Sequence, residues 1–207
     1  MNCKLCIVEY GEREVAHLAS QDGVLGEAIT RIGHISRTVE SNLFIALVQS
    51  IISQQISTKA ADTVWNRFSA RCGVVTPDVV LSLSEEDVAQ CGMSKRKAGY
   101  LLGLANTICA GELDLEHLAL LDDEEVIETL CKQSGIGRWT AEMMLIFSLS
   151  RPDVVSFSDL GIRRGMMKLY GLDSLSKETF MECKMRYSPY GSVASLYLWE
   201  IAHGESM

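Results

Sequence analysis

A short glycine-containing turn and an acidic residue beyond it have the clearest capacity for chemistry in this sequence. The stretch reads Ser134-Gly135-Ile136-Gly137-Arg138-Trp139-Thr140-Ala141, and Asp159 follows one helix later. The turn ends one helical pattern at Cys131–Lys132 and starts another at Arg138, which predicts backbone N–H groups pointing outward at a helix start, suited to a phosphate. If that phosphate belongs to a nucleic-acid strand, the Asp159 carboxylate is a candidate for chemistry on the strand.

The elements that must position these residues are helical. From Glu12 onward, apolar residues recur at helical spacing almost throughout, with only three prolines and no Ser/Gly-rich linker. Ser57 and Ser94 are predicted helix N-caps, and Ser188 with Pro189 is predicted to start the last helix. Cys6–Tyr10 could form a strand, but no second strand-like run offers a partner. We therefore predict a compact all-α fold of about ten helices.

The chain is long enough for one domain built of two lobes. We expect a single domain over 1–207, with a central helical lobe of about 40–115, a second lobe made from the N-terminal helices and about 116–207, and a cleft between the lobes. With 47% apolar and 22% charged residues, it should fold as an ordinary globular protein.

Charge and composition exclude several classes of protein. The net charge of −8 argues against general nucleic-acid affinity, although Lys95-Arg96-Lys97 and Arg163-Arg164 are local basic clusters. No segment has the roughly 18 consecutive apolar residues of a membrane helix, and no signal peptide is visible, which predicts no membrane partner and a cytoplasmic protein, nucleoid-associated if bacterial.

The cysteines and histidines predict no side-chain metal site. Seven cysteines are scattered and suit reduced core thiols, and Cys183 stands alone near the C-terminus, which excludes an iron–sulfur cluster there. Cys3 and Cys6 have metal-like spacing, but no second pair matches them. The four histidines lie far apart.

With these residues in view, the chain resembles a known family. Ser134–Ala141, Pro152-Asp153-Val154 and Asp159 are similar to the hairpin and Gly/Pro-rich loop of the helix–hairpin–helix (HhH-GPD) superfamily of DNA glycosylases, most of all its 3-methyladenine DNA glycosylase II branch. The resemblance covers most of the chain, because three further stretches match in order: Ile52–Ala61, Gly92–Ala98 and Tyr187–Trp199.

The resemblance implies a monofunctional glycosylase of base excision repair. It would act as a monomer on double-stranded DNA and flip out a damaged, alkylated purine of the 3-methyladenine type. It would then hydrolyse the N-glycosidic bond of this purine. Asp159 would stabilise the oxocarbenium-like sugar and activate the attacking water. A helix start at Asp159 would stabilise its carboxylate form. In the lyase branch of the family a lysine nucleophile occupies the position of Trp139, so water is the expected nucleophile.

Alternatives remain open at this stage. The chain could be a glycosylase for 8-oxoguanine, uracil or a mismatched base, or a non-catalytic damage-sensing module that keeps the hairpin, and an abasic-site lyase is disfavoured by Trp139. Asp159 could be only a helix-start acid. The loop Val155-Ser156-Phe157-Ser158 lacks the proline that the family often carries, which leaves its shape open.

The resemblance also implies roles for other residues. We expect a base pocket from Trp139, Tyr190 and Met143, with Met144 and Trp199 as further members, although packing is the simpler role for the methionines and a core position is favoured for Trp199. Gln55 is the preferred DNA wedge and Gln54 the second choice, against helix capping for both. The hairpin contacts to phosphate would come from Gly135, Gly137, Arg138 and Thr140. Further DNA-backbone contacts would come from Lys95, Arg96, Lys97, Arg163 and Arg164. No cofactor is expected to be required, although in the family the hairpin carbonyls often hold a structural monovalent cation (Na⁺ or K⁺).

Overall fold

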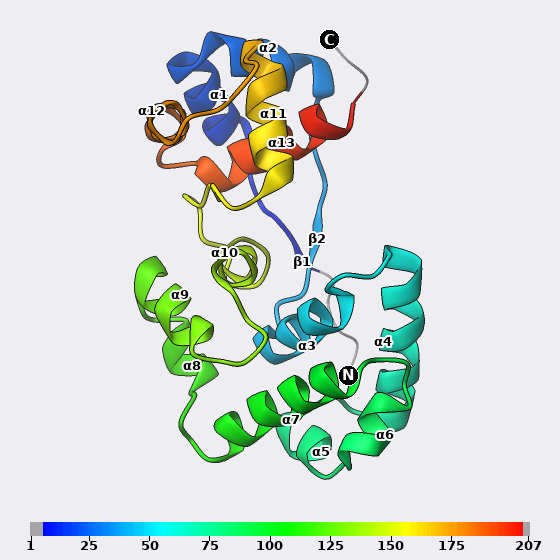
Figure 1. Cartoon of the computed structure of the whole chain (residues 1–207). Helices are drawn as coiled ribbons and strands as arrows, with labels where there is room; N and C mark the ends of the chain where they lie inside the picture. Colours follow the sequence, from blue (N-terminus) through cyan, green and yellow to red (C-terminus); the bar gives the residue numbers. More distant parts are fainter. Residues whose placement is uncertain (1–5, 205–207) are drawn as a thin grey trace. The chain divides into compact units, whose positions relative to one another are not determined.

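The computed structural model describes residues 6–204, in which nearly all regular structure is helical (Figure 1). This range holds thirteen helices and two strands of two residues, which confirms the all-α prediction. Cys3 lies outside the described residues, and so does any site built on it. The elements are β1 (Cys6–Ile7), α1 (Glu12–Gln21), α2 (Gly23–Ile32), β2 (Thr38–Val39), α3 (Leu43–Ser53), α4 (Thr58–Cys72), α5 (Pro77–Leu81), α6 (Glu85–Ala89), α7 (Lys95–Cys109), α8 (Leu115–Leu118), α9 (Asp123–Cys131), α10 (Arg138–Phe147), α11 (Leu160–Tyr170), α12 (Lys177–Tyr187) and α13 (Gly191–His203).

Local sequence sets most helix ends. Ser57 and Ser94 accept the backbone N–H groups of Ala60 and Lys97, each at 3.3 Å, so both predicted N-caps are confirmed. Gly171, at φ +63°, ends α11 in the left-handed conformation that glycine adopts readily. The count exceeds about ten mainly because α5, α6 and α8 are single turns.

Two local predictions were wrong. The N-terminal strand does have a partner, because β1 pairs antiparallel with β2; two residues without apolar alternation are too short for periodicity to reveal. Ser188 and Pro189 do not begin α13. Ser188 is the C-cap of α12, and Tyr190 is the N-cap of α13. Pattern alone could not separate the end of one helix from the start of the next.

The chain folds as two compact units. Within the described part of the chain, one comprises residues 6–39 and 145–204, and the other residues 40–144. Residues 116–144 thus group with the central helices, whereas the prediction assigned them to the other lobe; the sequence marks no boundary at 144, which falls inside α10.

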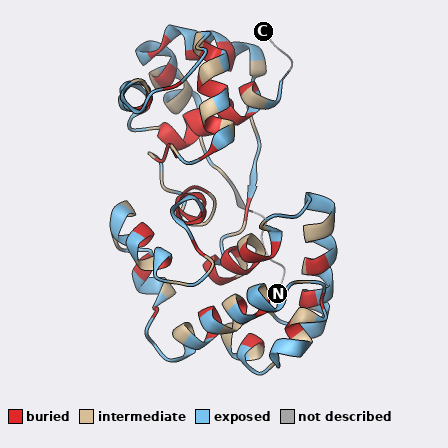
Figure 2. Ribbon diagram, in the orientation of Figure 1, coloured by how far each residue is buried: buried red, intermediate tan, exposed pale blue. Residues whose placement is uncertain are grey.

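In the first unit, α11 and α13 form the main helix pair. They pack side by side, and α2 contacts both (Figure 1). Ten of the thirteen residues of α13 are buried, which makes it the central helix of this unit (Figure 2). A helix that is apolar on nearly all sides must be surrounded by others.

In the second unit, α7 packs against α5, α6 and α3, and α3 packs against α4. The apolar α3 is largely buried, because a helix with apolar residues on most sides must be covered by others (Figure 2). Among the helices within residues 6–204, none is both long and apolar enough to cross a bilayer.

Candidate active site

Asp159 stands at the N-terminus of α11, in the first unit. It is the N-cap residue, only 6% exposed, and its Oδ1 accepts hydrogen bonds from the backbone N–H of Ile162 at 2.8 Å and from the indole N–H of Trp199 at 3.0 Å. The helix-capping role weighed from the sequence is therefore present. The indole donor is an additional partner that capping does not require.

Two glycines on α11 bring Trp199 to this carboxylate. A Cβ atom on Gly161 would lie 2.7 Å from Cδ1 of Trp199, and one on Gly165 would lie 2.1 Å from the carbonyl oxygen of Leu198. Small residues one turn apart thus allow α13 to approach the α11 backbone closely. Trp199 is 8% exposed and stacks on Phe147 with the ring centroids 5.5 Å apart, so its ring is fixed by packing as well.

The loop that leads to Asp159 is attached to the start of α13. Asp153 accepts the hydroxyl of Ser188 at 2.5 Å and the backbone N–H of Gly191 at 3.0 Å. Ser192 Oγ donates to the carbonyl oxygen of Arg151 at 2.5 Å and accepts the N–H of Val154 at 3.0 Å. These bonds fix residues 151–154, which lead directly into the stretch 155–158 that lacks the proline.

The other predicted residues of this unit do not gather around Asp159. The guanidinium of Arg163 lies 4.9 Å from the ring centroid of Phe157, and its buried Nε has no hydrogen-bond partner. Arg164 is exposed on α11. Tyr190 packs edge-on against His17, and it precedes Trp199 by nine residues, about 13 Å along the helix axis.

The hairpin between α9 and α10 lies in the second unit. Gly135 has φ +85°, and a Cβ atom there would lie 2.4 Å from the ring of Tyr100, so both backbone conformation and space require glycine. Ile136 is buried and donates its N–H to Gln133 O at 3.1 Å. The predicted helix end at Cys131 and helix start at Arg138 are confirmed, so the first N–H groups of α10 face outward from the helix end.

Arg138 is engaged within this unit. Its two terminal nitrogens donate to the carboxylate of Glu124 at 2.6 and 2.8 Å, and its Nε donates to Glu142 at 3.1 Å. The hydrogen bonds to Glu124 raise the pKa of Arg138 above its ordinary value. The side chain therefore joins α9 to α10, an interaction that sequence spacing could not show.

The remaining hairpin residues differ in exposure. Trp139 is 44% exposed at the start of α10, whereas Thr140, Met143 and Met144 are buried. The buried positions of the methionines fit the packing role weighed from the sequence.

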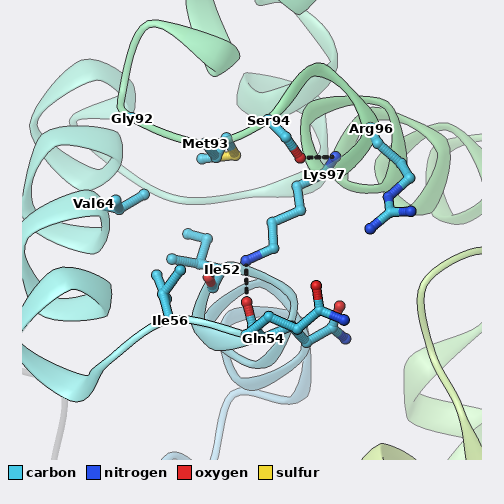
Figure 3. Close-up of a pocket in the computed structure, with 10 residues that line it drawn as sticks. Ile52, Gln54, Ile56, Val64, Gly92, Met93, Ser94, Arg96 and Lys97 are labelled. Carbon is cyan, nitrogen blue, oxygen red and sulfur yellow. Dashed lines mark hydrogen bonds between the residues drawn. The ribbon is translucent and has the colours of Figure 1, made fainter.

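The turn after α3 carries both glutamines. The amide nitrogen of Gln54 donates to Gly135 O at 2.8 Å, while Gln55 is exposed and has φ +59°, an uncommon conformation for a residue other than glycine. Beside them is a pocket of about 270 Å³ (Figure 3). It is lined by Ile52, Gln54, Gln55, Ile56, Val64, Gly92, Met93, Ser94, Arg96 and Lys97.

The basic residues at the start of α7 occupy three different environments. Lys95 is exposed and pairs with Glu86 at 3.7 Å, and Arg96 is exposed at the pocket rim. Lys97 is half-buried, and its ammonium donates to the carbonyl oxygens of Ile52 and Gln54 at 2.7 and 2.6 Å. Burial, and then the charge of Arg96, lower the pKa of Lys97.

The hairpin carbonyls have the chemistry that an alkali cation requires. Gly135 O accepts from Gln54 and Gln133 O accepts from Ile136 N, and each carbonyl oxygen keeps a second lone pair for a hard cation. Among residues 6–204, no group of three or more His, Cys, Asp or Glu side chains is arranged to hold a metal ion. The cation remains a prediction.

Within each unit, then, the structure brings some of the predicted residues together. Gln54, Gln55, Lys97 and the hairpin lie together in the second unit, and Asp159 lies with Trp199 in the first. Trp199 was assigned mainly to the core, and Tyr100 was not singled out at all. The signal for Trp199 was the pair Gly161 and Gly165 at one-turn spacing on a helix otherwise able to carry larger residues.

A family profile decides the relationship. The profile described as HhH-GPD superfamily base excision DNA repair protein matches residues 48–189, more than half of the chain. The chain belongs to this superfamily. The match includes the Gln54–Gln55 turn, the hairpin and Asp159, and it ends just before Tyr190.

Named superfamily members extend the similarity over nearly the whole chain. The DNA-3-methyladenine glycosidase of Bacillus halodurans has a crystal structure with TM-score 0.85 and 35% identity, covering 97% of this chain and 93% of its own. The Schizosaccharomyces pombe 3-methyladenine DNA glycosylase Mag1, solved with abasic DNA, gives TM-score 0.80 and 30% identity over 94% of this chain and 98% of its own. The DNA-3-methyladenine glycosylase of Saccharomyces cerevisiae is 35% identical in an alignment that covers 81% of this chain and 69% of that relative.

Proposed function

We propose that this protein is a monofunctional DNA glycosylase that acts as a monomer on double-stranded DNA and hydrolyses the N-glycosidic bond of alkylated purines. One observation carries the proposal: the buried carboxylate of Asp159, at a helix N-terminus, is oriented through Oδ1 by the Ile162 N–H and the Trp199 indole. The names of the relatives, DNA-3-methyladenine glycosylases, support the same activity.

In the proposed reaction, the bond between C1′ and the purine nitrogen breaks, and its electron pair goes to the base. The sugar becomes oxocarbenium-like, and the negative charge of Asp159 stabilises it. Water adds its oxygen to C1′ and releases a proton to Asp159 or to solvent. An alkylated purine is cationic and leaves as a neutral base, so little acid catalysis is needed at the base.

The position of Trp139 supports water as the nucleophile. An indole has no amine to form a Schiff base with C1′, so the lysine chemistry of a combined glycosylase and lyase has no group at this position. The same exposed ring is the first candidate for stacking on a cationic base, because aromatic faces attract cations. Met143 and Tyr190 are secondary candidates for the pocket.

DNA binding would use the second unit. We propose that the N–H groups at the start of α10 hold a backbone phosphate and that Gln55 inserts into the duplex where the damaged nucleotide is flipped out. Gln55 is preferred over Gln54 because its side chain is exposed, whereas the amide of Gln54 is bonded to the hairpin. A monovalent cation on the hairpin carbonyls would add positive charge beside the phosphate.

The test is base release from duplexes that carry 3-methyladenine-type, hypoxanthine, 8-oxoguanine or uracil lesions, with strand breaks scored before and after alkali. We expect release of the alkylated base and strand breaks only after alkali. Asp159→Asn should reduce the single-turnover rate by about 10²-fold or more and retain DNA affinity, because the change removes charge and keeps shape.

Asp173→Asn is the matched control, since Asp173 is exposed in the loop after α11. Strand breaks without alkali would contradict the proposal that the enzyme is monofunctional. Release of hypoxanthine, 8-oxoguanine or uracil, but not of the alkylated base, would contradict the proposed substrate class. A third result would identify a non-catalytic damage-sensing module. In that case the protein binds DNA tightly but releases no base, and Asp159→Asn behaves as the parent protein does.

A further inference from the structure

The turn that follows α3 is held in an unfavourable conformation. Gln55 has φ +59°, which costs a non-glycine residue free energy and persists only where surrounding contacts fix it. The last carbonyl groups of a helix have no backbone N–H partners within it, so those at the end of α3 need other donors. The contacts that fix this turn therefore control where the exposed Gln55 side chain points.

Lys97 supplies those donors from another helix. Its ammonium reaches from α7 to the carbonyl oxygens of Ile52 and Gln54, 45 and 43 residues earlier, at 2.7 and 2.6 Å (Figure 3). A cation at the C-terminal end of a helix also interacts favourably with the helix dipole. Sequence analysis predicted a DNA-backbone contact for Lys97, but with two of its three protons directed at the end of α3 the ammonium is poorly placed to make one.

The same helix supports the hairpin. Tyr100, one turn beyond Lys97, packs against Gly135 so closely that no side chain fits there. Gln54 completes the arrangement, because its amide donates to Gly135 O at 2.8 Å across 81 residues of sequence. Through Lys97, Tyr100 and Gln54, the turn with Gln55 and the hairpin have fixed positions relative to each other.

We propose that Lys97 is a positioning residue for nucleotide flipping: it holds the Gln55 turn against the hairpin, so that a strand bound by the hairpin meets Gln55 at a fixed distance. The inference rests on the proposed function, in which the hairpin binds phosphate and Gln55 inserts. It assigns to Lys97 neither contact with the DNA nor a part in breaking the bond.

The experiment compares Lys97→Met, which keeps the aliphatic stem and removes the donors, with the parent protein on two substrates. One is a fully paired duplex containing the released lesion, and the other has the same lesion in a bulge, where unstacking costs less. We expect the single-turnover rate to fall about 10-fold on the duplex and less than about 2-fold on the bulge. The 2-aminopurine fluorescence that reports unstacking in the duplex should fall in parallel.

Three further variants make the result specific. Lys97→Arg should restore most of the duplex rate, because a guanidinium also donates to two carbonyls. Gln54→Met should show the same duplex-selective loss and serves as the second test if Lys97→Met does not fold. Lys177→Met, on an exposed lysine of α12, should match the parent protein.

An equal loss on both substrates would overturn the inference, since that result indicates general damage to the fold. An unchanged duplex rate in Lys97→Met would also overturn it. So would a slope of log affinity against log salt that is less steep by about 1 in this variant, because that change marks a lost phosphate contact. If the parent protein releases no base at all, the proposed function fails. The role of Lys97 can then still be tested by comparing the 2-aminopurine fluorescence of the parent protein and Lys97→Met on a duplex with an abasic site. A lower signal with Lys97→Met would support the inference, and an equal signal would overturn it.

Discussion

The indole Nε1 of Trp199 donates to Oδ1 of Asp159 at 3.0 Å, with both residues buried. The two residues are 40 positions apart, on helices that approach closely at Gly161 and Gly165. A capping carboxylate needs only the Ile162 N–H, so the indole adds a second constraint on the plane of the carboxylate. A charge that must face a developing oxocarbenium ion benefits from this preorganisation.

Trp199→Phe should therefore reduce catalysis more than stability. The phenyl ring keeps the stacking on Phe147 and loses only the donor to Asp159. A hydrogen bond to a charged group is worth about 1.5–3 kcal/mol, which predicts a single-turnover rate lower by about 10-fold or more. Base release under single-turnover conditions and DNA affinity are the measurements.

Trp65→Phe is the control for this prediction, because Trp65 packs against Phe68 in the other unit and has no part in the proposed chemistry. A Trp199→Phe protein with the parent rate would show that the indole donor is not needed to orient the carboxylate.

The close approach of α11 and α13 predicts a large effect for a small substitution. In Gly165→Ala, the new Cβ would lie 2.1 Å from the carbonyl oxygen of Leu198, so the helices must separate. Overpacking of this kind costs about 1–3 kcal/mol, and it should also lower activity by moving Trp199. Urea denaturation gives the free energy of unfolding.

Gly103→Ala makes the same change in α7, where nothing lies within 4 Å of the new atom. It should stabilise the protein by about 0.5–1 kcal/mol, because alanine has the higher helix propensity. Equal effects of the two substitutions would contradict the proposed packing constraint.

The sequence revealed most where local chemistry decides the outcome. Ser57, Ser94 and Gly171 mark helix ends through bonds or conformations that involve only nearby residues, and the hairpin around Gly135 was recognisable for the same reason. Pairings between distant segments were out of reach. The β1–β2 pair and the bond from Trp199 to Asp159 join segments that are far apart in sequence. The glycine spacing on α11 indicates that something approaches closely there, but it does not identify Trp199 as the residue that does so.

The basic residues show the same limit most clearly. Lys95, Arg96 and Lys97 are adjacent in sequence and looked equivalent, but Lys97 turns inward to two carbonyl groups while Arg96 stays exposed. Which member of a charged run faces inward depends on the acceptors that another helix happens to present there. That information is tertiary, and the sequence alone does not contain it in readable form.

Stability should fall at alkaline pH. Burial raises the pKa of the phenols of Tyr170, Tyr187 and Tyr197 above the ordinary value of 10.0, and that of the Cys183 thiol above 9.0. Below about pH 8 these groups are mostly protonated in both folded and unfolded chains. Above it the unfolded chain loses protons that the folded chain keeps, so the unfolded state is favoured as pH rises.

Urea midpoints at about pH 7.5 and about pH 10.5 are the measurement, and Tyr197→Phe should reduce the difference between them because it removes one titrating phenol. An unchanged midpoint at the higher pH would show that these groups ionise as readily in the folded chain.

Arg138 and Arg96 should differ in their effect on DNA binding, although both are arginines at helix starts in the second unit. Arg138 is already paired with Glu124 and Glu142, whereas Arg96 is exposed at the pocket rim. A charge that is already compensated releases few counterions from DNA, so Arg138→Gln should leave the slope of log affinity against log salt unchanged. Arg96→Gln should make this slope less steep by about 1. Fluorescence anisotropy at several salt concentrations gives both slopes. Arg138→Gln should instead lower stability, since the buried Glu142 carboxylate loses this donor; a reduced salt slope in that variant would mean that DNA displaces the two glutamates from Arg138.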